Sequence, residues 1–306
     1  MQKIVSFGGG MQSMGLLVLA AQGKIDYKTV IFCNVGEDSE YPPTLKYVHE
    51  IAMPYAEKHG IELIELRKYL KDGSVDTLFQ RLTRPGSRSI GIPVRMSTGA
   101  PSNRTCTVDF KIKIVDKWMK ERIGKEAITE RKKGLLKACE ITDMSKENMP
   151  IALRRVDGFL KEHEPLAQVA LGISLDEIQR VKVNMDPETL AWKVNDFPLI
   201  RLRMSRQDCI NIIADAKLPI PTRSACSFCP YHSIQKWQDM RQNEPELFQQ
   251  AVDLEKTINT RRASDGLDAV WFTNKLKPLE QATSELKQES MFEDKEDVCE
   301  SGYCFL

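Results

Sequence analysis

Three consecutive glycines near the start of the chain, Gly8–Gly10, join a strand pattern to a helix pattern. Lys3–Phe7 has the composition of a short strand, and Met11–Gln22 has the apolar spacing of a helix. Glycine permits positive φ and lets the backbone approach a ligand closely. The amides of Gly8–Gln12 and the start of the helix would then point at an anion. The sequence therefore predicts a phosphate-binding turn, with a tight strand–helix turn that binds nothing as the alternative.

The first third of the chain continues to alternate between strand and helix patterns. Thr29–Asn34 is a run typical of a buried strand, and Ile61–Leu66 is a third strand pattern. Between them Pro43–His59 reads as a helix with a kink at Pro54. Such alternation implies right-handed crossovers and a mostly parallel sheet. We therefore expect an α/β fold, Rossmann-like, with helices flanking the sheet.

The rest of the chain is predicted to be mainly helical, with one further strand at Gln168–Gly172. A polar insertion is expected at about residues 125–165, beside the sheet. We expect an α/β domain over residues 1–200 and a helical region over residues 201–306. The expected helices are Asp109–Ile123, Ser205–Ala216, Gln235–Asn243 and Pro245–Thr260, with Ser205 as an N-cap.

Composition sets limits on the class of protein. The 306 residues have a net charge of +1, and no apolar run approaches the length of a membrane span. The first residues lack the layout of a signal peptide, so we expect a cytoplasmic, reducing compartment and no membrane partner. In such a compartment the eight cysteines indicate metal binding or chemistry before disulfides.

Charge is distributed unevenly along the chain. Residues 67–133 hold 17 Lys and Arg against 7 Asp and Glu, whereas residues 285–300 hold seven acids against two lysines. A basic middle predicts a polyanion site and an acidic tail that covers it; solvated helix faces are the alternative. The candidate substrate-binding residues are Arg84, Arg88, Arg95 and Arg104.

The glycine turn resembles the PP-loop of the adenine-nucleotide α-hydrolase-like superfamily. That superfamily (the HUP type of Rossmann-like fold) includes ATP pyrophosphatases, tRNA thiolases and phosphoadenosine phosphosulfate (PAPS) reductases. Gly8 and Gln12 depart from its pattern, which has Ser and Asp there. The resemblance implies ATP or PAPS as the adenine nucleotide, bound with Mg²⁺. The nucleotide-binding residues that it implies are Ser6, Phe7, Gly8, Gly9, Gly10, Met11, Gln12 and Ser13, with Gln12 also catalytic.

Two later segments resemble motifs of the same family. Val30–Glu37 is similar to the turn after its second strand, which implies nucleotide contacts from Asn34 and Glu37. Leu171–Arg180 is similar to a later motif that begins with a glycine, here Gly172. Helical spacing places its charged residues on one face, where they suit ribose, phosphate or Mg²⁺ contacts, although such a trio is more often a surface ion-pair cluster. The candidate catalytic residues are Asp176, Glu177 and Arg180.

A Cys-x-x-Cys pair followed by proline, Cys226–Pro230, is the ordinary way to hold zinc or an iron–sulfur cluster. Cys106, five residues before Lys111, resembles an element that accompanies this pair in cluster-containing members of the family. The resemblance therefore implies a [4Fe-4S] cluster on Cys106, Cys226 and Cys229, and adds Lys111 to the substrate-binding residues. A zinc site completed by His232 is the alternative, and so is no metal.

The other cysteines divide into two groups. Cys33, Cys139 and Cys209 lie in apolar or helical stretches and are expected to pack. Cys299 and Cys304 lie in the acidic tail, where the PAPS reductases carry a nucleophilic cysteine. These two are candidate catalytic residues, as nucleophile, ligand or persulfide carrier, and an idle tail is the alternative.

Three functions are consistent with these features. The first is an ATP pyrophosphatase-type enzyme of sulfur chemistry, which adenylates a substrate and then accepts sulfur from a donor; a tRNA or DNA substrate would explain the basic residues. The second is reduction of a sulfonucleotide. The third is a zinc-stabilised nucleotide- or nucleic-acid-binding module without chemistry.

Overall fold

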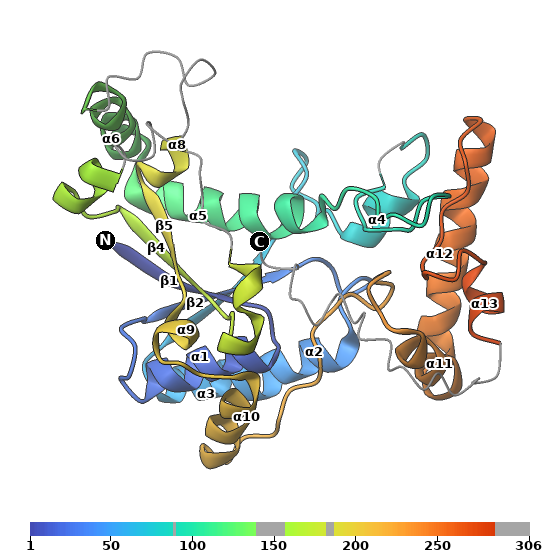
Figure 1. The fold of residues 1–306 in the computed structure, drawn as a ribbon, viewed down its shortest axis with the longest axis horizontal. Coiled ribbons are helices and arrows are strands. Elements are labelled where there is room, and N and C mark those ends of the chain that lie inside the picture. The colour runs from blue at the N-terminus through green and yellow to red at the C-terminus, as the bar shows by residue number, and fades with distance from the viewer. Residues whose placement is uncertain (88–89, 139–156, 182–186, 285–306) are drawn as a thin grey trace. The chain divides into compact units, whose positions relative to one another are not determined.

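Five strands form one parallel sheet in the order β3-β2-β1-β4-β5 in the computed structural model (Figure 1). The structure describes residues 1–87, 90–138, 157–181 and 187–284. The strands are β1 (Gln2–Phe7), β2 (Thr29–Asn34), β3 (Glu62–Arg67), β4 (Ala167–Leu171) and β5 (Lys193–Asp196). The expected α/β fold, with a parallel sheet and flanking helices, is confirmed at this level.

The two central strands consist of apolar residues that are buried on both faces. Val5 pairs with Val30 of β2 on one side and with Ala170 of β4 on the other, and all three side chains are fully buried. Runs of this kind are typical of parallel strands covered by helices. β5 was not predicted, because its four residues are half-buried and mostly polar.

Helices cover both faces of the sheet, with α5 above the strands in Figure 1 and α1, α3 and α10 below them. Their bounds are α1 (Met11–Ala21), α3 (Met53–Lys58), α5 (Lys113–Ile123) and α10 (Arg206–Asp215). The helix expected over 43–59 is divided into α2 (Pro42–Tyr47), a π-helical turn (Val48–Ala52) and α3. Pro54 lacks an amide hydrogen and crowds the preceding turn, so a regular helix cannot continue through it.

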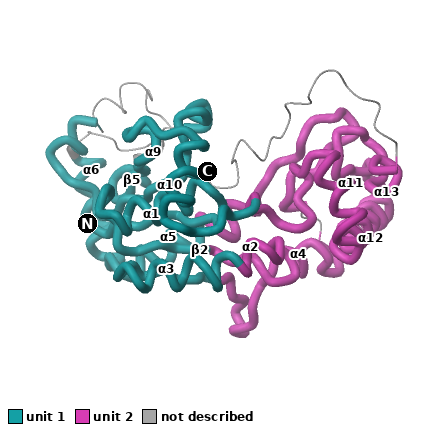
Figure 2. The backbone as a smooth tube through the Cα atoms, turned by 90° about the horizontal axis from the view of Figure 1, so that it is seen from below, with its two compact units in different colours: residues 1–32, 47–66, 113–222 teal, residues 33–46, 67–112, 223–306 magenta. Residues whose placement is uncertain are grey.

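The chain divides into two compact units that alternate along the sequence (Figure 2). Unit 1 contains residues 1–32, 47–66 and 113–222, and unit 2 contains residues 33–46, 67–112 and 223–306. A single boundary near residue 200 was expected from composition. Composition along the chain cannot mark a boundary between these units, because each unit is assembled from three segments that are far apart in the sequence.

Unit 2 is built around its own apolar core. Its helices are α4 (Leu78–Thr83), α11 (Ile234–Asn243), α12 (Pro245–Ser264) and α13 (Leu279–Ala282), together with a π-helical turn at Val108–Ile112. Side chains from all of these elements join one buried cluster that includes Leu82, Phe110, Trp237, Leu254 and Leu279.

The remaining elements lie in unit 1: α6 (Lys125–Ala138), a 3₁₀ turn at Leu175–Arg180, α8 (Pro187–Leu190) and α9 (Pro198–Arg201). Much of the expected insertion, including Cys139, lies outside the described residues, and so do Arg88 and the acidic tail with Cys299 and Cys304. Among the helices that the structure describes, none combines the length and apolar character needed to cross a bilayer.

Gly15 lies where α1 packs against α10. A Cβ at this position would lie 3.1 Å from both the Cβ and Sγ of Cys209. We therefore expect Gly15→Val to lower the free energy of unfolding by about 1–3 kcal/mol, measured by urea denaturation, because a packed core resists added volume.

Gly134, inside α6, provides a matched control. A Cβ there would meet only the Phe159 ring, at 3.9 Å. Gly134→Ala should leave the protein as stable or up to about 1 kcal/mol more stable, because alanine is the better helix former. Equal effects of the two substitutions would contradict the packing argument.

Candidate functional site

The glycine turn and the segment that follows β4 lie at the same edge of the sheet, within unit 1. β1 lies between β2 and β4 and runs parallel to both, so the carboxyl ends of these strands meet at one edge. The chain leaves β1 toward β2 on one side, while β4 lies on the other. This is a topological switch point, where open α/β sheets bind their ligands.

The glycine turn has the geometry of an anion site. Gly9 has a φ of 76°, which favours glycine, and Gly10 is the N-cap of α1. No side chain caps this helix, and its first turn contains no acid. The first amides of α1 therefore have no intrahelical partner and no capping side chain, which leaves them available to an anion.

The other residues predicted to bind the nucleotide lie within the turn or next to it. Ser6 and Phe7 are the last residues of β1, and Ser6 pairs in register with Leu171 of β4. The Ser13 hydroxyl donates to the carbonyl oxygen of Gly10 at 2.9 Å, which closes the turn. Gly8 is buried, whereas Met11 and Gln12 are half-buried.

Gly172 lies directly against the glycine turn. A Cβ on Gly172 would lie 3.1 Å from the backbone nitrogen of Ser13 and 3.2 Å from the backbone carbon of Gln12. Contacts this short would require the backbone of the turn to shift by a few tenths of an ångström, and backbone atoms move aside less easily than the end of a side chain, so glycine is favoured here. The structure thus brings Gly172 and the turn together, as the sequence predicted.

Ser174 is a residue at this edge that the sequence analysis did not single out. It is fully buried, and its hydroxyl has no hydrogen-bond partner among the described residues. A buried hydroxyl without a partner is costly, and a ligand can satisfy it. The only sequence signal was its place two residues after Gly172, and serine is too common for that to be informative.

The three charged residues after Gly172 are engaged with the protein itself. The Glu177 carboxylate accepts a hydrogen bond from Arg180, and both side chains are buried. Burial raises the pKa of Glu177, and the charge of Arg180 opposes that rise. Asp176 accepts from the amide of Arg206 at 3.0 Å, at the start of α10. The helical spacing therefore does place Glu177 beside Arg180, but as a buried ion pair.

Asn34 and Glu37 form a small polar cluster in unit 2. The Asn34 side chain accepts from the amide of Gly36 at 2.8 Å and donates to Glu37 at 3.3 Å. Arg67 donates to the Glu37 carboxylate at 2.9 Å. Gly36 has a φ of 127°, and a Cβ there would overlap the side chains of Asp38 and Thr77. These contacts fix a tight turn directly after β2.

The predicted metal ligands all lie in unit 2. Cys226 and Cys229 form a tight turn, in which the amide of Cys229 donates to the carbonyl of Cys226 at 3.1 Å. Cys106 and Cys226 both pack against the apolar core of this unit. Within the part of the chain that the structure describes, no three Cys, His, Asp or Glu side chains converge as a metal site would require.

His232 is half-buried against this turn. Its Nε2 lies 2.9 Å from the carbonyl oxygen of Cys226, and its ring packs edge-on against Trp237 at 4.9 Å. Burial lowers the pKa of His232 to about 4, so the ring is neutral at pH 7 with its proton on Nε2. Only Nδ1 could then serve as a ligand.

Cys33 and Cys209 are buried, as expected. Burial raises the pKa of each thiol to about 12, which makes both poor nucleophiles at neutral pH.

The predicted substrate-binding residues that the structure describes lie in unit 2 and differ in their surroundings. Arg84 contacts the buried carboxylate of Asp76 at 3.3 Å. Lys111 lies 3.8 Å from Glu40, and Arg104 lies over the Tyr231 ring at 5.9 Å. Arg95 has a buried Nε without a hydrogen-bond partner among the described residues.

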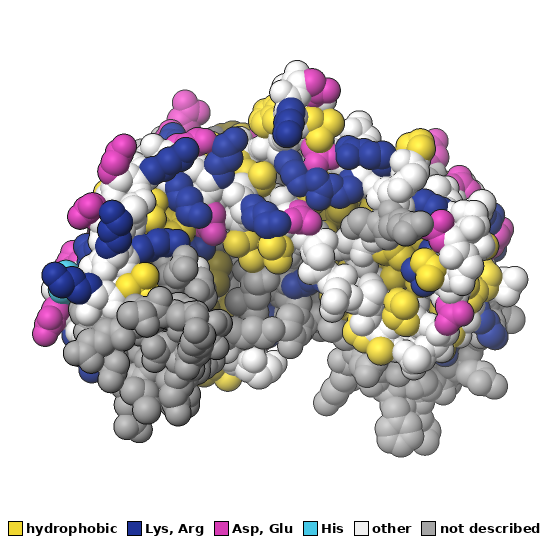
Figure 3. Space-filling model, turned by 90° about the horizontal axis from the view of Figure 1, so that it is seen from above, with side chains coloured by type: hydrophobic (Ala, Val, Ile, Leu, Met, Phe, Trp, Pro, Cys, Tyr) yellow, Lys and Arg dark blue, Asp and Glu magenta, His cyan; other side chains and the backbone are white. Residues whose placement is uncertain are grey.

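Basic residues also cover α5 and α6 in unit 1. Figure 3 looks onto this side of unit 1 and shows Lys and Arg side chains gathered there. Several lie over aromatic rings: Arg122 is 3.6 Å from the centre of the Trp118 ring, and Lys120 is 5.2 Å from that of Trp192. Cations placed on aromatic rings are a common feature of nucleic-acid-binding surfaces.

Comparison of the chain with protein-family models, with curated proteins and with solved structures finds no match.

Removing Arg180 should destabilise the protein. Arg180→Met would leave the Glu177 carboxylate buried without its partner, at a cost of about 3–5 kcal/mol at pH 7.5. A carboxyl whose pKa is raised in the folded state destabilises that state as pH rises through the folded pKa. Denaturation with urea at pH 5 and at pH 7.5 should therefore show the smaller loss at pH 5.

Arg201 provides the exposed counterpart. It pairs with Asp196 at 2.9 Å, but its side chain is 58% exposed. Arg201→Met should cost less than about 1 kcal/mol. If Arg180→Met is equally mild and instead weakens nucleotide binding, Arg180 faces a ligand rather than Glu177.

Proposed function

We propose that the chain is an ATP-dependent enzyme of the PP-loop type, which adenylates a substrate for attack by sulfur. The observation that carries this proposal is the uncapped glycine turn at the switch point of a parallel sheet, with Gly172 packed against it. The resemblance of the turn to a PP-loop assigns the anion to an adenine nucleotide and the fold to the HUP type.

The glycine turn and the first turn of α1 bind the nucleotide's phosphates in this proposal. The amides of Gly9–Gln12 donate to phosphate oxygens, and the Gln12 side chain supplies a neutral hydrogen bond where the family has a carboxylate. Mg²⁺, held mainly by the phosphates and water, would neutralise charge on the pyrophosphate. The buried hydroxyl of Ser174 is a further donor at this edge.

With the phosphates of ATP held in this way, the proposed reaction has two steps. A substrate oxygen attacks the α-phosphorus, the bond from that phosphorus to the bridging oxygen breaks, and pyrophosphate leaves. A sulfur nucleophile from a donor then attacks the activated carbon, and AMP leaves with the original oxygen. The amides favour the first step because they hold the negative charge that moves onto the leaving pyrophosphate.

A nucleic acid is the substrate class that the basic residues favour. The cations of α5, held over aromatic rings, suit backbone phosphates, and Arg104 over Tyr231 repeats the arrangement in unit 2. A reducing cytoplasm suits this substrate.

A metal centre on Cys106, Cys226 and Cys229 is the third part of the proposal. Cysteine thiolates are the usual ligands of a [4Fe-4S] cluster, which would supply sulfur-binding or redox chemistry. The described side chains do not converge on one point, so no step of the reaction above depends on the cluster.

Replacing Gly172 should weaken ATP binding. The Cβ of Gly172→Ala would press on the backbone of Gln12 and Ser13, so we expect the Kd for ATP to rise about tenfold or more, measured by calorimetry. Gly158→Ala, whose Cβ would have no neighbour within 4 Å, is the control and should bind normally. Wild-type ATP affinity in a folded Gly172→Ala protein would contradict the site.

Product analysis separates this function from its alternatives. Pyrophosphate released from ATP in the presence of RNA or DNA supports adenylation, whereas sulfite released from PAPS points to a sulfonucleotide reductase. If the protein does neither and binds stoichiometric zinc, it is a binding module.

The metal centre has its own test. Protein purified without oxygen should contain iron and sulfide and absorb near 400 nm, and serine at Cys106, Cys226 or Cys229 should remove that absorption. Cys209→Ala, in unit 1, should retain it. Stoichiometric zinc that is lost in His232→Ala would replace the cluster with a structural site.

A further inference from the structure

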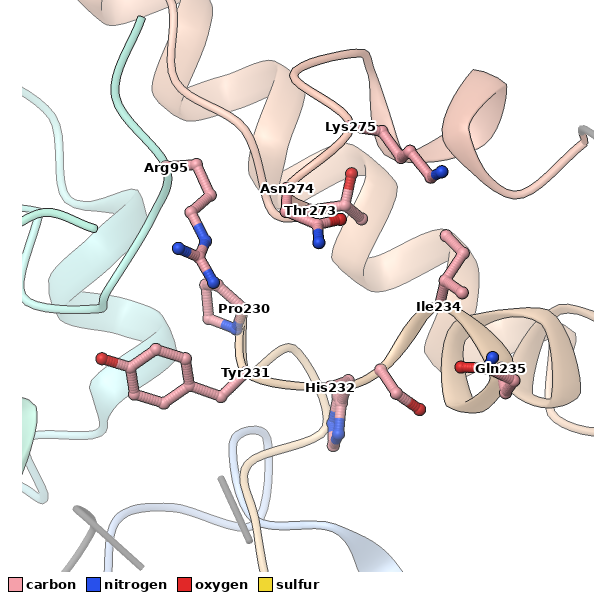
Figure 4. Close-up of a pocket in the computed structure, with 10 residues that line it drawn as sticks. Arg95, Pro230, Tyr231, His232, Ile234, Gln235, Thr273, Asn274 and Lys275 are labelled. Carbon is pink, nitrogen blue, oxygen red and sulfur yellow. The ribbon is translucent and has the colours of Figure 1, made fainter. Parts of the chain in front are cut away.

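A small pocket in unit 2 lies beside the cysteine turn (Figure 4). The turn Pro230–Ser233 forms one wall, and Arg95 and the segment Thr273–Lys275 form the others. The first two residues of α11, Ile234 and Gln235, complete it. We infer that this pocket binds a single phosphate group.

The backbone around the pocket is held by hydrogen bonds on every side. The amide and carbonyl of Arg95 pair with the carbonyl and amide of Trp271, at 2.7 and 2.9 Å. The buried carboxylate of Glu255 accepts from the amides of Phe272 and Leu279, both at 2.7 Å. These bonds fix Thr273–Lys275 opposite Arg95, so the pocket is formed before any ligand arrives.

The lining residues supply donors and positive charge. The guanidinium of Arg95 and the side-chain amide of Asn274 point toward the space between the walls in Figure 4. Arg95 and Lys275 are its cations, and none of the lining residues is acidic. The local charge is therefore positive and matches an anion.

Two buried polar atoms of the lining have no hydrogen-bond partner among the described residues. Thr273 is only 5% exposed and its Oγ1 is one of them; the Nε of Arg95 is the other. Buried groups of this kind are costly unless a ligand or water satisfies them. A ligand in the pocket is one way to satisfy them.

The amino end of α11 adds a third source of donors. Ser233 caps this ten-residue helix by accepting from the amide of Lys236, at 3.2 Å. The amides of Ile234 and Gln235 precede the helix's own hydrogen bonds and carry the positive end of its dipole. Arg95, Thr273 and this helix end thus favour the same kind of ligand independently.

The size of the pocket limits the ligand. A volume of about 40 Å³ is open to the centres of water-sized spheres. One water requires roughly 10–15 Å³ on that measure, so the space suits a few atoms. It suits a tetrahedral phosphate, free or as one unit of a nucleic-acid backbone.

Orthophosphate is the first probe. At constant ionic strength it should slow hydrogen exchange in residues 234–236 and 273–275 of the whole protein. Arg95→Gln should weaken this protection about tenfold or more in phosphate concentration, because it removes a charged donor, and Thr273→Val should weaken it severalfold. Lys256→Gln, which removes one positive charge of unit 2 outside the lining, should behave as wild type.

A second probe distinguishes a free phosphate from a backbone phosphate. It is a fluorescently labelled single-stranded DNA oligonucleotide, whose binding is measured by anisotropy. If Arg95→Gln weakens its binding and orthophosphate competes with it, the pocket holds a backbone phosphate; if only orthophosphate responds, the pocket holds the free ion. Gly172→Ala should retain pocket protection, which separates this site from the nucleotide site. The inference is overturned if orthophosphate does not protect these segments, or if folded Arg95→Gln and Thr273→Val proteins are protected as wild type is.

Discussion

The close approach of the backbone after β4 to the turn after β1 is the constraint on which the candidate nucleotide site depends. Parallel pairing of the two strands, with Ser6 opposite Leu171, places Gly172, the residue after β4, directly against the glycine turn. A side chain there would press on the backbone of Gln12 and Ser13, so packing favours glycine at position 172. The same pairing places the uncapped start of α1 at the sheet's carboxyl edge, where its amides face outward rather than into a partner strand. The pairing of β1 with β4 thus determines both the register of the sheet and the position of the glycine turn.

Much of this arrangement was predictable from the sequence, because it depends on local patterns. The apolar runs of β1, β2 and β4 and the three glycines of the turn are strong local signals, and parallel topology follows from the strand–helix alternation. β5 was missed because Lys193–Asp196 is a half-buried edge strand with one apolar side chain. The alternation of the two units was also missed, since it depends on contacts between distant segments that leave no compositional mark.

The candidate site residues show where such reasoning ends. Helical spacing correctly placed Glu177 near Arg180, but spacing cannot tell a ligand-facing trio from a buried pair, and burial decides that question. Conversely, the most informative polar groups were inconspicuous in the sequence. Ser174 and Thr273 are single hydroxyls of common residue types, and they stand out only because folding buries each without a described partner. Arg95 was selected for its charge in a loop rich in glycine and proline, whereas its significance comes from the pairing with Trp271.

His232 connects the cysteine turn with the pocket beside it. One side of the ring donates to the carbonyl of Cys226 and so helps to hold the Cys-x-x-Cys turn, while the residue also forms part of the pocket wall. Loss of solvation lowers the pKa of the ring to about 4, which keeps it neutral, so it adds no charge to the pocket at neutral pH. The positive charge of the pocket therefore belongs to Arg95 and Lys275. Pro230–Ser233 follows Cys229 directly in the chain, so this segment links the cysteine turn to the pocket wall.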